Sequence, residues 1–121
     1  MSDISSQIWD MKYRLKAPDG TPVDRDVADT WARVALAAAQ AEPVETRAQH
    51  ALDFAAALTS HRFIPAGRIL AGAGTDRSVT LFNCFVMGAI EDSMDGIFSA
   101  VREAALTLQQ GGGIGYDFST L

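Results

Sequence analysis

The only cysteine of the chain, Cys84, is the side chain best suited to redox chemistry. It lies in an apolar run, residues 81–87, that is rich in residues favouring β-strands. One cysteine cannot form a disulfide within the chain, so redox chemistry at Cys84 would require a sulfur atom from elsewhere. The alternative is that Cys84 is a small hydrophobic core residue of a buried strand. Residue type alone leaves both roles open and predicts a buried side chain.

Two glycine-rich segments, residues 72–74 and 111–115, could bring backbone N–H groups close to a phosphate. Neither is a dinucleotide-binding or Walker motif, because the triple glycine at 111–113 follows a predicted helix and precedes a predicted strand. The alternative role is conformational: tight turns and a helix C-cap, which glycine favours because it adopts positive φ.

Asp92 and Ser93 precede an amphipathic segment and are predicted to cap a helix. Asp92 could in addition hydrogen-bond a sugar hydroxyl, as acidic residues do in many nucleotide sites. His50 and His61 are too far apart to form a local metal-binding pair, and one cysteine excludes a multi-cysteine zinc site. The sequence therefore predicts no metal site.

Hydrophobic periodicity predicts three helices, from residue 24 or 26 to about 40, over 44–59 and over 92–110. Residues 71–77 are expected to form a flexible loop. The side chains expected to face inward are Val27, Thr30, Trp31, Val34, Ala35 and Ala38 in the first helix, Ala48, Leu52, Ala55, Ala56 and Leu58 in the second, and Ile97, Val101, Ala104, Ala105 and Leu108 in the third.

Strands are predicted over residues 79–87, buried on both faces, and over residues 114–118. A strand, a helix and a strand in this order indicate a parallel pair joined by a crossover helix. Two parallel strands alone leave unpaired edges, so we expect this part of the chain to open a larger sheet or barrel. The predicted fold class is mainly α with a small β element (α+β).

Composition indicates a single globular chain: of 121 residues, 48% are hydrophobic and 21% are charged. A net charge of −5 argues against nucleic-acid or membrane partners. The polar, acidic N-terminus does not resemble a signal peptide, and the longest apolar runs are far shorter than the roughly 20 residues that span a bilayer. With its single cysteine, the chain is expected to be cytoplasmic.

From about residue 8 to its end, the chain resembles the N-terminal part of the large chain of an adenosylcobalamin-dependent (class II) ribonucleotide reductase. No single motif carries this resemblance; the order and spacing of several do. The matching stretches are residues 8–16, 29–35, 63–75, 83–97 and 110–119. The resemblance implies a helical N-terminal reductase domain over 1–78, and over 79–121 the first strand, helix and strand of a ten-stranded α/β barrel.

The resemblance also implies roles for individual residues. Cys84 matches the first of two reducing cysteines, which donate electrons as the ribose 2′-hydroxyl leaves and end as a disulfide. The residues that match segments near the substrate ribose and phosphates are Pro65, Ala66, Gly67 and Asn83. Those that match the allosteric effector site, on a helix at the dimer interface, are Asp92 and Ser93.

In the family the radical cysteine, the second reducing cysteine and the cobalamin-contacting part all lie downstream of the stretch matched here. We therefore expect an N-terminal fragment or split subunit that is inactive alone. It would act with the remaining reductase chain, adenosylcobalamin and nucleotide substrates and effectors, as a homo-oligomer. Two alternatives stay open: a non-catalytic nucleotide-binding or protein-interaction module derived from the reductase, and an inert truncated product.

Overall fold

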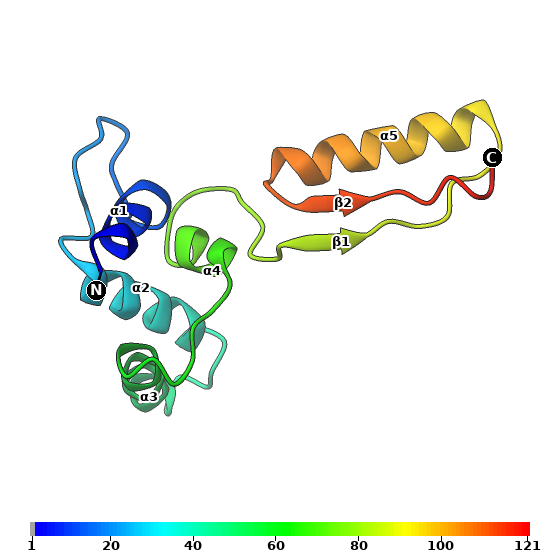
Figure 1. Ribbon diagram of the computed structural model, residues 1–121. Coiled ribbons are helices and arrows are strands. Elements are labelled where there is room, and N and C mark those ends of the chain that lie inside the picture. The colour runs from blue at the N-terminus through cyan, green and yellow to red at the C-terminus, as the bar shows by residue number, and fades with distance from the viewer. Residues whose placement is uncertain (1) are drawn as a thin grey trace. The chain divides into compact units, whose positions relative to one another are not determined.

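The computed structural model describes residues 2–121 and forms two compact units, one ending at Arg77 and the other spanning Ser78–Leu121 (Figure 1). The first unit contains α1 (Asp3–Lys12), α2 (Val27–Ala39), α3 (Arg47–Thr59) and α4 (Gly67–Gly72). The second contains β1 (Cys84–Val86), α5 (Met94–Gln109) and β2 (Gly113–Gly115). A mainly helical chain with one small parallel sheet confirms the predicted fold class.

Helix α2 follows its prediction closely. The Asp26 carboxylate accepts hydrogen bonds from the backbone N–H groups of Ala28 and Asp29, which fixes the start of the helix. The prediction of an inward-facing Ala38 is wrong, because Ala38 is exposed and Ala39 is buried instead.

Helix α3 begins three residues later than predicted, because Pro43 and Thr46 form a turn before it. Its inward face was also predicted wrongly: Leu52 is 66% exposed, whereas Ala51 is buried. Alanines occur all round this helix and therefore do not define a face. The larger side chain of Leu58, predicted to face inward, is buried.

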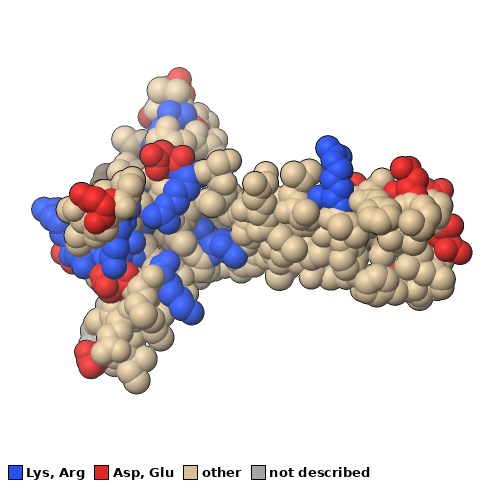
Figure 2. All heavy atoms as spheres, turned by 90° about the horizontal axis from the view of Figure 1, so that it is seen from above, with Lys and Arg blue, Asp and Glu red and all other residues tan. Residues whose placement is uncertain are grey.

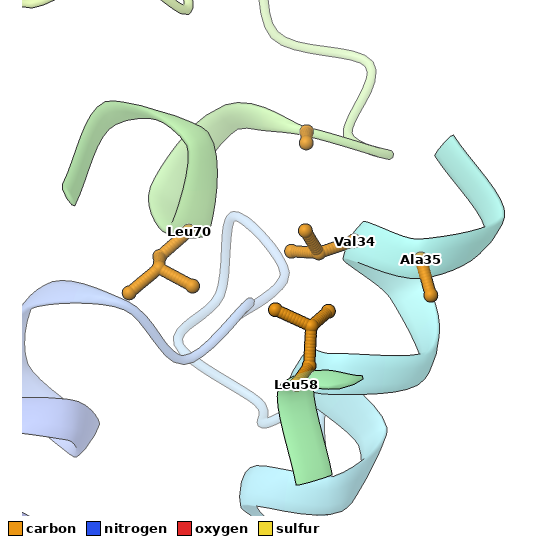
Figure 3. Close-up of a cluster of buried hydrophobic side chains, with 5 residues drawn as sticks. Val34, Ala35, Leu58 and Leu70 are labelled. Carbon is orange, nitrogen blue, oxygen red and sulfur yellow. The ribbon is translucent and has the colours of Figure 1, made fainter. Parts of the chain in front are cut away.

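The core of the first unit joins α2, α3 and α4 (Figure 3). Its buried members are Val34, Ala35, Leu58, Leu70 and Ala73. Helix α4 was not predicted, because glycines begin and end it; its residues 71–72 lie within the expected loop. Tertiary contact between Leu70 and this core outweighs the weak helix propensity of glycine.

In the second unit, the parallel pairing of β1 with β2 confirms the predicted crossover connection. Ser93 caps α5 by accepting a hydrogen bond from the Gly96 N–H, 3.0 Å from its hydroxyl oxygen. Gly111 ends α5 with a φ of +86°, which confirms the predicted C-cap glycine.

The strands themselves are shorter than predicted, with three residues each, and the prediction of burial on both faces is wrong. Cys84 and Val86 are both exposed. Helix α5 covers only one face of a two-stranded sheet, so the other face is left exposed within the unit.

Helix α5 likewise buries a narrower strip than predicted. Ala104 is buried, but Val101 and Leu108 are 52% and 53% exposed. Two short strands cannot cover the wider apolar face that the sequence pattern indicated. None of the helices formed by residues 2–121 combines the length and the apolar character needed to cross a membrane.

Candidate functional site

The Cys84 thiol lies on the face of the sheet that α5 leaves uncovered. Successive side chains of a strand point to opposite faces. Phe85 packs on the α5 side, where it lines a small cavity with Leu106 and Thr107. Cys84 and Val86 therefore point the other way, and both are exposed. A thiol in this position can meet another molecule or another part of a larger fold.

The triple glycine places the start of β2 directly beside Cys84. Cys84 is paired in register with Gly113, and the Gly113 N–H donates a hydrogen bond of 2.7 Å to the Asn83 carbonyl oxygen. At Gly112, a Cβ atom would lie 2.6 Å from the Phe85 ring and 2.9 Å from the Thr107 methyl group. These glycines therefore allow α5, the turn and β1 to approach closely, as the conformational alternative predicted.

Asn83 and Cys84 are thus brought together at the start of β1. The Asn83 backbone carbonyl is used in pairing with β2, while the residue as a whole is exposed. The Cys84 thiol is free and exposed, so its accessibility is what the geometry offers for chemistry.

Asp92 and Ser93 lie at the other end of the second unit from Cys84. They precede the first turn of α5, whereas Cys84 lies beside the turn that follows its last residue (Figure 1). A helix of 16 residues is about 24 Å long, so the two ends cannot share one small ligand. Ser93 is occupied as the helix cap, and Asp92 is exposed.

Pro65, Ala66 and Gly67 belong to the helical unit, where they lead into α4. Pro65 is buried and Ala66 is the exposed residue before the helix. Gly67 lies against Tyr13, whose ring and hydroxyl would be 3.3 Å from a Cβ at this position. The structure describes these three residues within their own unit, and Asn83 and Cys84 within the other.

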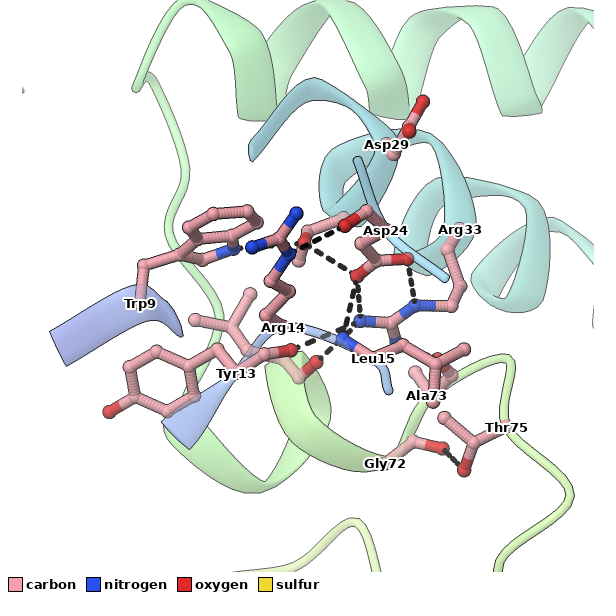
Figure 4. A network of polar contacts seen from close by, with 12 residues as sticks. Trp9, Tyr13, Arg14, Leu15, Asp24, Asp29, Arg33, Gly72, Ala73 and Thr75 are labelled. Atoms are coloured by element: carbon pink, nitrogen blue, oxygen red, sulfur yellow. Dashed lines mark hydrogen bonds and ion pairs between the residues drawn. The ribbon is translucent and has the colours of Figure 1, made fainter. Parts of the chain in front are cut away.

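A buried ion pair that sequence reasoning missed organises the helical unit (Figure 4). Asp24 and Arg33 are joined by a contact of 2.9 Å, with side chains only 4% and 10% exposed. The Asp24 carboxylate also accepts hydrogen bonds from the Thr30 hydroxyl at 2.7 Å and the Leu15 N–H at 3.1 Å. In turn Thr30 accepts one from the Trp9 indole, so α1 joins the network.

Arg33 connects this hydrogen-bond network to the end of α4. Its guanidinium donates hydrogen bonds to the carbonyl oxygens of Leu70 and Ala73. Gly74, with a φ of +71°, passes so close that a Cβ there would lie 2.7 Å from the Arg33 side chain. The only signal in the sequence is a single arginine beside the apolar face of α2, and its partner Asp24 could not be identified from spacing.

Opposing effects act on the pKa of Asp24. Burial raises it, but hydrogen bonds from Arg33 and Thr30 outweigh burial and hold the pKa below its ordinary value. The carboxylate is therefore charged at neutral pH and acts as a structural anion. Elsewhere on this unit, the Arg25 side chain lowers the pKa of Asp29 to about 2.

Charge is distributed unevenly along the chain. The second unit has one basic and five acidic side chains, and in Figure 2 most of its visible surface is uncharged. Within residues 2–121, no three His, Cys, Asp or Glu side chains come together in a way that could hold a metal ion. Arg102 is the one basic side chain of residues 78–121.

Two family models match the chain. Residues 1–78 match the model described as ribonucleotide reductase, all-alpha domain, and residues 82–121 match the model described as ribonucleotide reductase, barrel domain.

Curated relatives of the chain include two named as ribonucleoside-diphosphate reductases. Over 113 residues the chain is 39% identical to a vitamin B12-dependent ribonucleoside-diphosphate reductase of Mycobacterium tuberculosis, covering 91% of this chain and 16% of that protein. Over 108 residues it is 32% identical to ribonucleoside-diphosphate reductase subunit alpha of Helicobacter pylori, covering 89% and 13%. The chain thus spans about a sixth of the length of these relatives or less.

Proposed function

Because the chain belongs to the ribonucleotide reductase large-chain family, we propose that it contributes one redox cysteine and part of the nucleotide sites to the reduction of ribonucleotides. Residues 1–78 are assigned to the helical domain and residues 79–121 to the start of the barrel. The observation that carries the proposal is the exposed Cys84 thiol on the uncovered face of a two-stranded parallel sheet.

The reaction proposed for Cys84 is a two-electron oxidation. Its thiol and a second thiol on the remaining reductase chain form a disulfide, releasing two protons and two electrons. The ribose 2′-hydroxyl leaves as water, and the sugar carbon receives hydrogen in its place. An external dithiol then reduces the disulfide and restores both thiols. Asn83, beside Cys84, and the Pro65, Ala66 and Gly67 segment are assigned to substrate binding.

The small number of hydrophobic side chains that the second unit buries supports assembly with a further chain. Within residues 78–121, all described by the structure, Ile90 and Ala104 are the only hydrophobic side chains in the buried core. Its exposed large hydrophobic side chains are Val79, Leu81, Phe82, Val86, Met94, Phe98, Val101, Leu106, Leu108, Phe118 and Leu121. Apolar surface on this scale is typical of an interface rather than of a free surface.

The cofactor is assigned to the assembled enzyme. The M. tuberculosis relative is named vitamin B12-dependent, and we propose adenosylcobalamin on that basis. Three cavities in the described residues have volumes of 410, 400 and 450 Å³, a size that suits a drug-like molecule. We propose that the cofactor binds in the assembled enzyme and is not held by this chain alone.

Asp92 and Ser93 are proposed to meet an effector nucleotide where α5 pairs with a second copy of the chain. An apolar stripe along α5 supports such pairing: Met94, Phe98, Val101 and Leu108 are all exposed. Their spacing of four, three and seven residues matches the seam of a helix pair. The effector site would then be completed by residues of both copies.

The experiment combines this chain with a candidate chain carrying the rest of the barrel, together with adenosylcobalamin, a nucleoside di- or triphosphate and a dithiol. Deoxynucleotide should form only when all components are present. Cys84→Ser should abolish it, while Leu52→Ser, on an exposed part of α3, should not. Formation that survives Cys84→Ser would remove the catalytic role.

The alternative is a non-catalytic module derived from the reductase, which would bind a nucleotide or the full-length enzyme. The observation that favours it is the exposed Asp92, which lies just before the N-terminus of α5. Both proposals place a nucleotide at Asp92, so calorimetry with a deoxynucleoside triphosphate should show binding that Asp92→Asn weakens in either case. The complementation assay separates the two, because this alternative predicts that no deoxynucleotide forms.

A further inference from the structure

We propose that Gly113 is a positioning residue for Cys84, one that keeps open the path by which a second sulfur atom reaches the thiol. This inference rests on the proposed redox function of Cys84 and adds the residue that controls access to it. It follows from the register of β1 and β2, in which Gly113 lies directly across from Cys84.

The space that Gly113 leaves empty borders the sulfur atom. A Cβ built at Gly113 would lie 3.6 Å from the Cys84 Sγ, which is van der Waals contact. It would also lie 3.2 Å from the Asn83 carbonyl oxygen, the acceptor of the Gly113 N–H hydrogen bond. A side chain here would cover one flank of the sulfur and press on the residue before it.

Gly115 shows that this role is specific to one glycine of β2. It lies two residues along the same strand and points to the same face, across from Val86. A Cβ at Gly115 would have no atom within 4 Å. Neither Gly113 nor Gly115 has positive φ, so alanine fits the backbone conformation of both. The pair therefore separates the effect of a side chain beside the thiol from the general effect of replacing a strand glycine.

A disulfide forms at Cys84 only if a second sulfur atom reaches its Sγ, so the rate of thiol–disulfide exchange is the appropriate probe of access. With dithiodipyridine, the Cys84 thiolate attacks one sulfur, forms a mixed disulfide and releases pyridinethiolate. With the smaller methyl methanethiosulfonate, the same thiolate forms a methyl disulfide and releases methanesulfinate. Neither reaction needs a partner chain, nucleotide or cofactor. The access proposal can therefore fail in this test while the proposed function stands, and the proposed function can fail in the complementation assay while the access proposal stands.

The 121-residue chain is compared with Gly113→Ala and Gly115→Ala, each checked for its helical content by circular dichroism. We expect Gly113→Ala to slow exchange with dithiodipyridine several-fold and exchange with the smaller reagent less, and Gly115→Ala to change neither. Gly113→Ser should slow exchange with dithiodipyridine in the same way. A Gly113→Ala rate equal to or above that of the unchanged chain, or equal slowing by Gly115→Ala, overturns the proposal.

Discussion

At the residue scale, Asp24 and Arg33 determine how the helical unit is held together. Their ion pair gathers α1, the loop before α2, α2 itself and the end of α4 around one carboxylate and one guanidinium. Buried charges are stable only when paired and fully hydrogen-bonded. Loss of either partner therefore leaves an uncompensated charge inside the unit.

Replacing Asp24 with Asn should destabilise the helical unit by about 3–5 kcal/mol, the usual cost of breaking a buried ion pair. Both tryptophans, Trp9 and Trp31, lie in this unit, so urea unfolding followed by tryptophan fluorescence measures its stability alone. Asp10→Asn is the matched control, because Asp10 pairs with Arg14 and Lys16 in a more exposed position. It should cost less than about 1 kcal/mol. Equal losses in the two variants would contradict the structural role of Asp24.

The same carboxylate makes stability dependent on pH. The folded-state pKa of Asp24 lies below its ordinary value of 3.8. The unfolded chain therefore takes up a proton first as the pH falls, and the stability contributed by Asp24 is lost from there through the lowered folded pKa. Tryptophan-monitored urea midpoints should fall more steeply below about pH 5 in the unchanged chain than in Asp24→Asn. Parallel pH profiles would show that Asp24 has no lowered pKa in the folded state.

At the scale of elements, the predictions succeeded where local chemistry decides and failed where packing decides. Ser93 and Gly111 cap α5 as predicted, because capping depends on neighbouring backbone groups. The start of α2, predicted at residue 24 or 26, is set by the same local chemistry, with Asp26 as the N-cap. The inward faces of α3 and α5 were partly wrong because they depend on which neighbours are present. The exposure of Cys84 was missed for the same reason: an apolar strand indicates burial, but α5, the helix of its own unit, covers only the opposite face of the sheet.

The close approach of Gly112 to Phe85 gives a direct test of the turn that carries α5 into β2. Gly112→Ala would place a Cβ 2.6 Å from the Phe85 ring and should destabilise this unit by about 1–3 kcal/mol. Hydrogen exchange of the α5 amides reports the opening of this unit. Gly115→Ala, where the Cβ meets open space, should leave hydrogen exchange of the α5 amides unchanged. Protection of α5 that persists in Gly112→Ala would show that the turn tolerates a side chain.

If α5 pairs with a second copy, a charge on its apolar stripe should separate the copies. Phe98→Glu places a carboxylate within the stripe, so sedimentation velocity should show a monomer. Ser99→Glu adds the same charge at the next, also exposed, position outside the stripe and should leave the oligomer intact. Identical sedimentation of both variants and the unchanged chain would argue against α5 as the interface.

At the scale of the whole molecule, family and fold class could be predicted from the sequence, whereas the state of the site could not. The order of several motifs predicted a ribonucleotide reductase, and matches to its all-alpha and barrel domains confirm this. The residues of the proposed substrate, redox and effector sites belong to different parts of the chain. Pro65, Ala66 and Gly67 belong to one unit and Cys84 to the other, while Asp92 lies a helix length from Cys84. Residue patterns do not contain the contacts that would join them, because such contacts depend on tertiary packing rather than on local sequence.

The central claim is that Cys84 supplies one half of a redox disulfide to such an assembly. A single-turnover reaction without external dithiol tests it directly, with the Cys84-containing peptide analysed by mass spectrometry under non-reducing conditions. We predict that Cys84 appears in a disulfide with the complementing chain in an amount that matches the deoxynucleotide formed. Deoxynucleotide formed while Cys84 remains a free thiol would contradict the account.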